Sequence, residues 1–234
     1  GYDTVAWLAS QSYCNGNIGT MGSSYNGWMQ WETARLQPPH LKAMCASSIP
    51  LELSEIDWPG GFKPARRIFW WLASMAPNIR RRNNLPPPHT TEDARRLWHS
   101  QYGERWLWFL PWADIPQYLP HGLAEYVDAW LKRPSEAIWG FQDIHQNVEV
   151  PNLDFSGWYD HCSGTTAHLG LMQQNAATKV ARTGSRLMLG PWNHAEIGKR
   201  KIGGIDFGEE AFIDTDAVKI RWCGHWLKGK DNGI

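Results

Sequence analysis

Three short motifs place a serine, an aspartate and a histidine directly after apolar runs of the chain. They are Gly22-Ser23-Ser24-Tyr25-Asn26-Gly27, Gly157-Trp158-Tyr159-Asp160 and Gly190-Pro191-Trp192-Asn193-His194. A serine hydroxyl is a weak nucleophile until a base removes its proton, and a histidine held by a carboxylate can be that base. We therefore expect Ser24 to attack an acyl carbon, His194 to act as base and then as acid, and Asp160 to orient the imidazole and stabilise its charged form.

Each of these assignments has a rival in the sequence. Ser23 lies one place early for the turn, and Asp143 and Asp154 are other acids in weaker contexts. The expected acid could instead be a helix N-cap, and the expected base could be a strand-end histidine bonded to backbone. His161, next to the acid, could perturb it or merely be exposed, and exposure is the preferred expectation.

The residues around the serine predict a strand, a sharp turn and a helix in direct succession. An apolar run, 17–21, comes before it and a helix-compatible run, 28–36, follows. A serine on such a turn is held in a strained conformation with its hydroxyl above the strand. Gly22 and Gly27 flank it where a side chain would crowd the neighbouring strand or helix. The N–H of Tyr25 is the expected oxyanion donor.

Later segments repeat this alternation of strand and helix. Residues 41–46 predict a second buried strand, and strand, helix and strand within about 30 residues indicate a parallel sheet. Residues 148–157 and 185–190 predict the strands that precede the acid and the base. Helices are expected at 165–181 and 214–227. Because open α/β sheets place their sites at the carboxyl ends of strands, the three groups should meet there.

The middle of the chain differs from its flanks in the pattern of its residues. Charged and aromatic residues mix at helical spacing, with a helix expected over 91–98, capped by Thr90 or Thr91, and another over 125–131. Many of the 16 tryptophans fall in this block: Trp58, Trp70, Trp71, Trp98, Trp106, Trp108, Trp112, Trp130 and Trp139. We predict a helical cap insertion at 51–146, between core segments 1–50 and 147–234.

Composition argues against several function classes. Lys plus Arg and Asp plus Glu are equal at 23 each, so no overall field favours nucleic acid or an anionic membrane. No apolar run approaches the ~20 residues that span a bilayer. Nucleic-acid binding through 80–82 has only a charge run in its favour. The cysteines, at 14, 45, 162 and 223, form no Cys-x-x-Cys, which argues against a zinc site and leaves their pairing open.

The three motifs resemble the family of cocaine esterase and Xaa-Pro dipeptidyl-peptidases, which is close to α-amino-acid ester hydrolases and cephalosporin acylases. Typical of it are the tyrosine after the serine, Trp-Tyr before the acid and Pro-Trp-x-His around the base. The resemblance covers essentially the whole chain. It implies an α/β-hydrolase fold with an inserted helical cap and, after the helix at 222–233, a C-terminal jelly roll.

The ends of the sequence suggest an internal piece of a longer protein. It starts at Gly1 without a methionine and stops at Ile234 in a turn-like segment. We expect the first sheet strands, the jelly roll and the family's second oxyanion donor, a tyrosine hydroxyl, to lie outside it. The compartment is left unassigned.

The resemblance implies a serine hydrolase that cleaves ester or amide bonds through an acyl-enzyme on Ser24, without a metal or organic cofactor. The substrate would be a small ester, an amide or a short peptide, and Xaa-Pro peptides are not separable from simple esters by sequence. A plain carboxylesterase or a β-lactam acylase is an alternative. Because the oxyanion segment is missing, a non-catalytic binding module is another. No nucleic-acid or membrane partner is expected, and a homo-oligomer is compatible with the sequence.

Substrate contacts are expected near the same motifs. Trp158, Tyr159 and Trp192 are predicted to line an acyl pocket, with packing of the strand ends as the alternative. A peptidase that takes a free amino terminus needs carboxylates to pair with the ammonium group. The candidates are Glu52, Glu55 and Asp57, which could also be surface charges.

Overall fold

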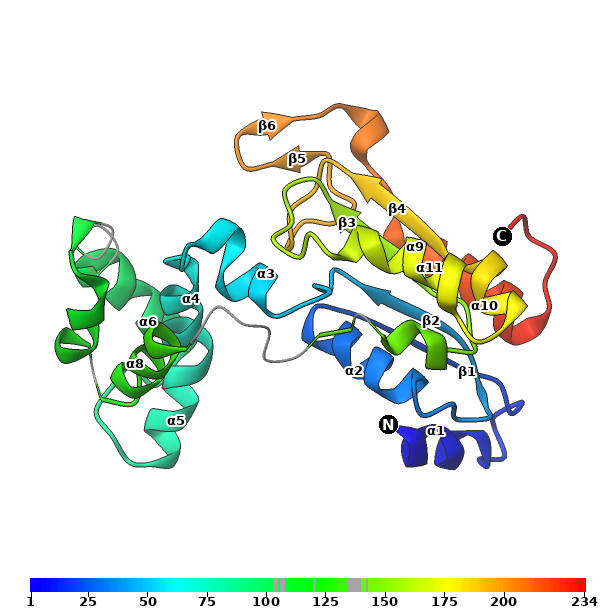
Figure 1. The fold of residues 1–234 in the computed structure, drawn as a ribbon, viewed down its shortest axis with the longest axis horizontal. Coiled ribbons are helices and arrows are strands. Elements are labelled where there is room, and N and C mark those ends of the chain that lie inside the picture. The colour runs from blue at the N-terminus through cyan, green and yellow to red at the C-terminus, as the bar shows by residue number, and fades with distance from the viewer. Residues whose placement is uncertain (103–104, 106–107, 120, 134–139, 142) are drawn as a thin grey trace. The chain divides into compact units, whose positions relative to one another are not determined.

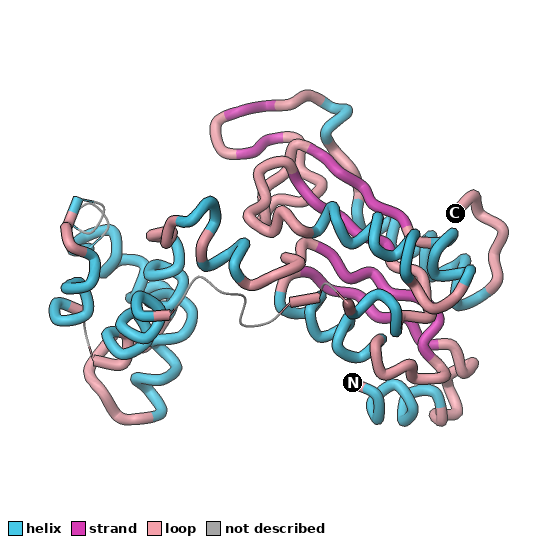
Figure 2. The backbone as a smooth tube through the Cα atoms, viewed as in Figure 1, coloured by secondary structure: helices cyan, strands magenta, loops and turns pink. Residues whose placement is uncertain are grey.

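The computed structural model describes residues 1–102, 105, 108–119, 121–133, 140–141 and 143–234. It divides into two compact units, one of Gly1–Ile56 and Ala137–Ile234 and the other of Asp57–Glu136 (Figure 1). Figure 2 shows strands in the first unit, whereas the described part of the second holds helices and loops. Trp106 and Trp139 lie outside the described residues. In the described part of the chain, no helix has the length and apolar character needed to cross a membrane.

The first unit is built on parallel strands. They are β1 (Ile18–Ser23), β2 (Leu41–Ser47), β3 (Leu153–Gly157) and β4 (Arg186–Gly190). β1 pairs with β2, and β3 pairs with β4, both in parallel register. A parallel bridge between Met44 and Asn152 brings β2 beside β3, which gives the order β1-β2-β3-β4. A short antiparallel hairpin follows, formed by β5 (Lys201–Ile202) and β6 (Ile205–Asp206).

A side chain makes part of the junction between β2 and β3. The Asn152 amide accepts the N–H of Ala46 at 2.8 Å and donates to the carbonyl of the same residue at 3.1 Å. Next to it, the N–H of Met44 donates to the carbonyl of Pro151 at 2.9 Å. Proline has no N–H to continue a ladder. The strand predicted at 148–157 is therefore correct only in its second half, where β3 lies.

Helices cover both faces of the sheet. On one face lie α1 (Tyr2–Ala9), α2 (Tyr25–Ala34), α9 (Thr165–Asn175) and α10 (Lys179–Gly184), and on the other lies α11 (Thr215–Lys228). Successive side chains of a strand point to opposite faces. In β2, Met44 shares an apolar cluster with Trp31 of α2, and Cys45 shares another with Trp222 of α11. Burial on both faces is the pattern of parallel sheets covered by helices.

The helix predicted at 165–181 is wrong in its continuity. The backbone leaves the helix at Ala176 (φ −57°, ψ 145°), and the hydroxyl of Thr178 then accepts the N–H of Ala181 at 3.0 Å. Because threonine is a good N-cap residue, the second helix starts where this cap is available. The predicted final helix is confirmed as α11, which Asp214 caps and which ends at Gly229 with φ 63°.

The second unit packs helical segments around a core of its own. The α-helices among its described residues include α4 (Arg66–Trp70), α5 (Ala76–Arg82), α6 (Thr91–Leu97) and α8 (Ala124–Lys132), and α3 (Ser54–Asp57) comes before them. Its 3-10 segments are η1 (Pro59–Gly61) and η4 (Trp112–Tyr118), and its π-helical segments are η2 (Trp71–Met75) and η3 (Trp98–Tyr102). Ile68, Leu72 and Trp130 are fully buried in the core. The predicted cap of α6 is confirmed, because the hydroxyl of Thr90 accepts the N–H of Asp93 at 3.1 Å.

A buried charge cluster belongs to this unit. The side chain of Asp57 is 2% exposed and lies 2.8 Å from Arg67 and 2.9 Å from Arg133. One carboxylate thus faces two guanidinium groups that come from opposite ends of the unit's sequence. Buried charges are retained where they are paired in this way.

Candidate active site

Ser24 stands in the strained turn between β1 and α2. Its φ is 57° and its ψ −129°, a conformation that costs a non-glycine residue about 1–3 kcal/mol. Its N–H donates to the carbonyl of Ser47 in β2 at 2.9 Å, and its own carbonyl accepts from Gly27 and Trp28 at 2.9 Å each. These backbone bonds hold the strained geometry at the carboxyl end of the strand.

The prediction that side chains at Gly22 and Gly27 would crowd their neighbours is confirmed. A Cβ added to Gly22 would lie 2.8 Å from the Cβ of Asn26, and one added to Gly27 would lie 2.7 Å from the Cδ1 of Ile49. Both distances are too short for a side chain at either position. The close approach of α2 to the sheet edge therefore requires glycine on each side of the serine.

Asp160 and His194 meet at the carboxyl ends of β3 and β4. The Nδ1 atom of His194 lies 2.9 Å from Oδ1 and 3.1 Å from Oδ2 of Asp160. The Asp160 side chain is 0% exposed, whereas that of His194 is 26% exposed. Backbone pairing continues past the strands, because the N–H of Trp158 donates to Gly190 and that of Tyr159 to Trp192, each at 3.0 Å.

Electrostatics keep the Asp160 carboxyl ionised. Burial alone raises its pKa, but the hydrogen bond and charge of His194, the N–H of Cys162 and the nearby His161 outweigh burial and bring the pKa below its ordinary value. An ionised carboxylate at Nδ1 holds the imidazole proton there, which leaves Nε2 as a proton acceptor.

Trp192 is placed by packing at the strand ends. It is 1% exposed, and its indole N–H donates to the carbonyl of Ala211 at 2.9 Å. A Cβ on Gly190 would lie 2.5 Å from its ring, and one on Gly157 would collide with its carbonyl. Trp192 therefore packs the strand ends, which is the alternative that the sequence analysis gave to an acyl-pocket wall.

The other two aromatic candidates are open to solvent. Trp158 is 74% and Tyr159 is 59% exposed. The ring of Tyr159 lies 6.0 Å from that of Phe207. These two side chains have the exposure that a substrate contact needs.

The rival residues occupy different settings. Ser23 is the last residue of β1 and lies opposite Ser47 of β2. Together with His194 it lines a cavity of about 200 Å³ at this edge of the sheet. In the described part of the chain, no hydrogen bond joins Ser24 to His194. Asp154 is buried in β3, and burial raises the pKa of its carboxyl well above the ordinary value, whereas the pKa of Asp160 is lowered. Asp143 is exposed before a 3-10 turn, η5 (Ile144–Asn147).

Two of the three candidate ammonium partners are engaged elsewhere. Glu55 accepts the N–H groups of Leu51 at 2.8 Å and Glu52 at 3.0 Å, and the N–H of Gly164. It therefore ties the segment after β2 to the loop before α9. Asp57 is held by the two arginines described above.

Sequence reasoning missed the surroundings of the acid and the base. The preferred prediction for His161, exposure, is wrong, whereas the alternative holds, because the charge of His161 contributes to lowering the pKa of Asp160. Its side chain is 30% exposed, its Nδ1 lies 3.7 Å from Oδ1 of Asp160, and its ring lies 4.3 Å from that of His194. The Sγ of Cys162 lies 3.8 Å from Nδ1 of His194. The run Asp-His-Cys was a usable signal, because a turn after a strand brings adjacent side chains around one point.

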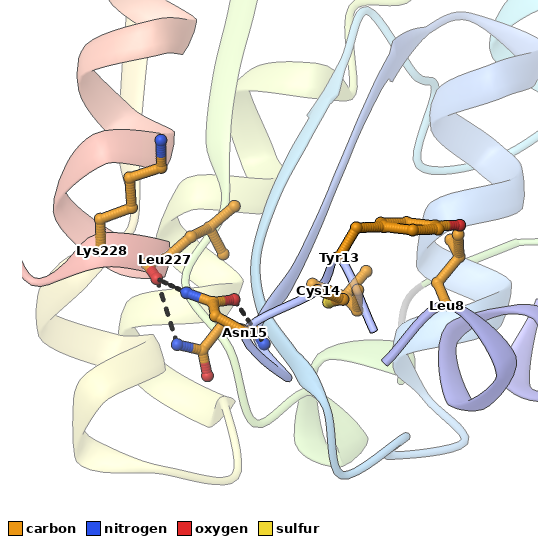
Figure 3. A pocket seen from close by; sticks show the side chains of 8 residues that line it. Leu8, Tyr13, Cys14, Asn15, Leu227 and Lys228 are labelled. Atoms are coloured by element: carbon orange, nitrogen blue, oxygen red, sulfur yellow. Dashed lines mark hydrogen bonds between the residues drawn. The ribbon is translucent and has the colours of Figure 1, made fainter. Parts of the chain in front are cut away.

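A second cavity lies at the opposite end of β1 from Ser24, because Ile18, the first residue of that strand, lines it. It measures about 380 Å³ and is lined from α1, the loop before β1 and the end of α11 (Figure 3). The side-chain amides of Asn15 and Asn17 both donate to the carbonyl of Leu227, at 3.0 and 3.1 Å. None of the predicted site residues lines it. We assign it no chemistry.

Comparison with known proteins gives the site a context. The model of a family described as X-Pro dipeptidyl-peptidase (S15 family) matches residues 1–196. Cocaine esterase of Rhodococcus sp. (strain MB1 Bresler) is 26% identical over 210 residues, which cover 85% of this chain and 34% of that protein. The chain spans 34% to 41% of the length of the curated relatives that it matches.

Solved structures show the fold. An aminopeptidase from a marine sediment archaeon (Thaumarchaeota archaeon) superposes with a TM-score of 0.55 at 18% identity, over 100% of this chain and 38% of that one. A CocE/NonD family hydrolase from Staphylococcus aureus gives 0.51 at 22% identity, over 99% of this chain and 32% of the other. With the parallel sheet and its covering helices, these likenesses confirm the predicted α/β-hydrolase fold.

Proposed function

The chain belongs to the X-Pro dipeptidyl-peptidase (S15) family, and we propose that it carries the catalytic residues of a serine hydrolase acting on ester or amide bonds. In this proposal Ser24 is the nucleophile, His194 the base and Asp160 the residue that orients it. The hydrogen bond between Asp160 and His194 carries the proposal, because it lies at the sheet edge that also holds the strained turn of Ser24.

In acylation, His194 would act first as a base and then as an acid. Nε2 of His194 removes the proton of the Ser24 hydroxyl while Oγ forms a bond to the acyl carbon. The carbonyl π electrons move to its oxygen, to which the N–H of Tyr25 donates. That N–H lies in the first turn of α2, where backbone donors have no partner within the helix. His194 then gives the proton to the leaving group, whose bond to carbon breaks.

Deacylation would repeat these steps with water. His194 takes a proton from water, whose oxygen attacks the acyl carbon, and returns that proton to Oγ of Ser24 as the acid product leaves. The imidazole is charged in each tetrahedral intermediate, and the buried carboxylate of Asp160 stabilises that charge. No step in this scheme needs a cofactor.

We propose esters with an uncharged acyl group as the preferred substrates, with Trp158 and Tyr159 as walls of the acyl site. Glu55 and Asp57 are already engaged inside the protein. Their engagement disfavours recognition of a free amino terminus through them, and thus an Xaa-Pro peptide. The resemblance to cocaine esterase supports the same choice.

Labelling with a fluorophosphonate, followed by peptide mass spectrometry, tests the nucleophile. The expected adduct lies on Ser24. Ser24→Ala should abolish it, and the matched control Ser23→Ala should retain it. His194→Ala should slow labelling by about 10⁴-fold or more, the usual cost of losing one member of such a triad.

An adduct on Ser23 would overturn the assignment of the nucleophile. Folded protein that gives no adduct would favour the alternative of a non-catalytic binding module. For the substrate, hydrolysis of a simple aryl ester is compared with that of a glycyl-proline anilide on the same preparation. A higher kcat/KM for the anilide would contradict the preference for esters.

A further inference from the structure

Four metal-ligating side chains converge beside the acid and the base. One ligand atom from each lies within 4.8 Å of the others, and the residues are Asp160, His161, Cys162 and His194. The first three follow β3 in one turn, and the fourth follows β4. The pairing of these two strands brings the groups together.

We propose that this cluster binds a thiophilic divalent cation of the Zn²⁺ class and that the bound cation inhibits the enzyme. The binding stands on the geometry of the cluster alone. The inhibition rests on the function proposed above for His194.

The distances suit a small four-coordinate ion. Zn²⁺ bonds of about 2.0–2.3 Å in a tetrahedron separate the ligand atoms by about 3.3–3.8 Å. His194 Nδ1 lies 3.8 Å from the sulfur of Cys162, and Asp160 Oδ1 lies 3.7 Å from Nδ1 of His161. The shortest separation, 2.9 Å between His194 and Asp160, is their hydrogen bond, which would open as an ion replaces the proton.

The donor set selects the class of cation. One sulfur, two imidazole nitrogens and one carboxylate oxygen suit Zn²⁺ and its neighbours, whereas Mg²⁺ and Ca²⁺ prefer oxygen ligands throughout. The Cys162 thiol would release its proton to solvent on binding, because the thiolate is the ligand. Together with the Asp160 carboxylate it then balances the two positive charges of the ion.

The burial of the four groups leaves a path for the ion. The side chain of Asp160 is 0% exposed and Cys162 is 1% exposed, so these two form the floor of the site. The side chains of His161 and His194 are 30% and 26% exposed and face solvent. An arriving ion meets the histidines first and the charged ligands behind them.

Inhibition follows from the tautomer of the base. An ion on Nδ1 of His194 takes the place of the proton held there, so the neutral ring carries its proton on Nε2. Nε2 can then no longer accept the proton of the Ser24 hydroxyl. A chelator that removes the ion would restore the catalytic tautomer.

The sequence argues against a zinc site only in that it lacks Cys-x-x-Cys. The ligand set here has a single cysteine and depends on the pairing of β3 with β4 for its fourth member. Only the folded chain shows it.

Titration with Co²⁺ tests the binding without any assay of activity. The wild-type chain should develop a thiolate-to-cobalt charge-transfer absorption that Zn²⁺ displaces. Cys162→Ser should lose this absorption, and the matched control Cys14→Ser should keep it. No absorption in the wild type, or an absorption that persists in Cys162→Ser, would overturn the site.

Fluorophosphonate labelling with and without Zn²⁺ tests the inhibition. Labelling of the wild type should fall with Zn²⁺ and recover with a chelator. Cys162→Ser, or His161→Gln where the buried substitution misfolds, should raise the half-inhibitory Zn²⁺ concentration by at least about 10–100-fold, a loss that even outer-shell changes cause. Unchanged Zn²⁺ sensitivity in a folded variant would overturn the inference. Absent labelling without metal would count against the proposed function, while the Co²⁺ titration would still decide the binding.

Discussion

The two units of this chain hold their residues in place by different means. In the α/β unit, backbone bonds such as those of Ser24 to Ser47 and of Trp158 to Gly190 place the chemistry-bearing residues. In the helical unit, side chains hold the segments together, with Asp57 between two arginines and Trp71 edge-on to Trp130 at 5.3 Å.

This difference has consequences for substitution. Where the backbone fixes a position, side chains can change as long as the chain path is kept. Where side chains fix it, one lost partner leaves a buried group uncompensated. The site should therefore be sensitive to changes at glycines, and the helical unit to changes of charge.

Asp57→Ala is expected to have the largest effect among the single substitutions, because it leaves two guanidinium groups without their carboxylate. We expect a loss of about 3 kcal/mol in the free energy of unfolding, near the lower end for a broken buried pair, because the Arg133 side chain is 34% exposed. Asp128→Ala, which removes the exposed pair with Lys132, should cost less than about 1 kcal/mol. Urea unfolding measures both, and equal midpoints would contradict the comparison.

Gly157→Ala tests the backbone side of the comparison. The new methyl group meets the carbonyl of Trp192, so the unfolding free energy should fall by about 1–3 kcal/mol and Ser24 labelling should drop. Gly170→Ala, in open space on α9, should instead stabilise by about 0.5–1 kcal/mol and leave labelling unchanged. Full labelling of Gly157→Ala would show that the site tolerates a shift of the strand ends.

Acid should weaken the α/β unit through His168. This residue is 1% exposed, stacks on Trp31 and lies 2.8 Å from His145. Burial, and then the charge of His145, lowers its pKa from 6.5 to about 3, so between these values the unfolded chain binds a proton that the folded chain does not. As the pH is lowered from 6.5 to about 3, the free energy of unfolding should decrease, by up to about 1.4 kcal/mol per pH unit.

His168→Gln is the variant that checks this dependence. The slope of the unfolding free energy against pH should flatten in this variant. Urea midpoints measured from neutral pH into the acid range report the slope even if the variant is less stable throughout. An unchanged slope would mean that another group dominates the acid response.

Equal and modest effects are expected from a matched pair of helix caps, one in each unit. Thr90→Ala removes the cap of α6 and Thr178→Ala that of α10, and each should cost about 1 kcal/mol. Neither should change Ser24 labelling. A loss of labelling in Thr178→Ala alone would show that α10 supports the site more closely than its contacts suggest.

Sequence patterns predicted local features well. The strained turn at Ser24, the crowded glycines beside it and the cap at Thr90 depend on neighbours within a few residues, which a pattern contains. The strands before Asp160 and His194 were found because short apolar runs end there. The catalytic roles of these residues stay predictions until labelling tests them.

Partners distant in sequence were the features that sequence could not supply. The carboxylate of Glu55 accepts the N–H of Gly164, and that of Asp57 pairs with Arg133. Both partners lie far along the chain from these acids. The break between α9 and α10 was missed because apolar spacing continues across it, and only the extended backbone at Ala176 shows it. The ring contact of His161 with His194 likewise depends on the position of β4, which His194 follows.

The amide of Asn152 has a consequence for how this chain could be divided. It joins Ala46, which comes before the helical segment in sequence, to β3, which comes after it. The two parts of the sheet are thus fastened by bonds that do not require the intervening polypeptide to be continuous. The helical segment is accordingly a natural place for fragment complementation, with the two cut pieces reassembling along this junction.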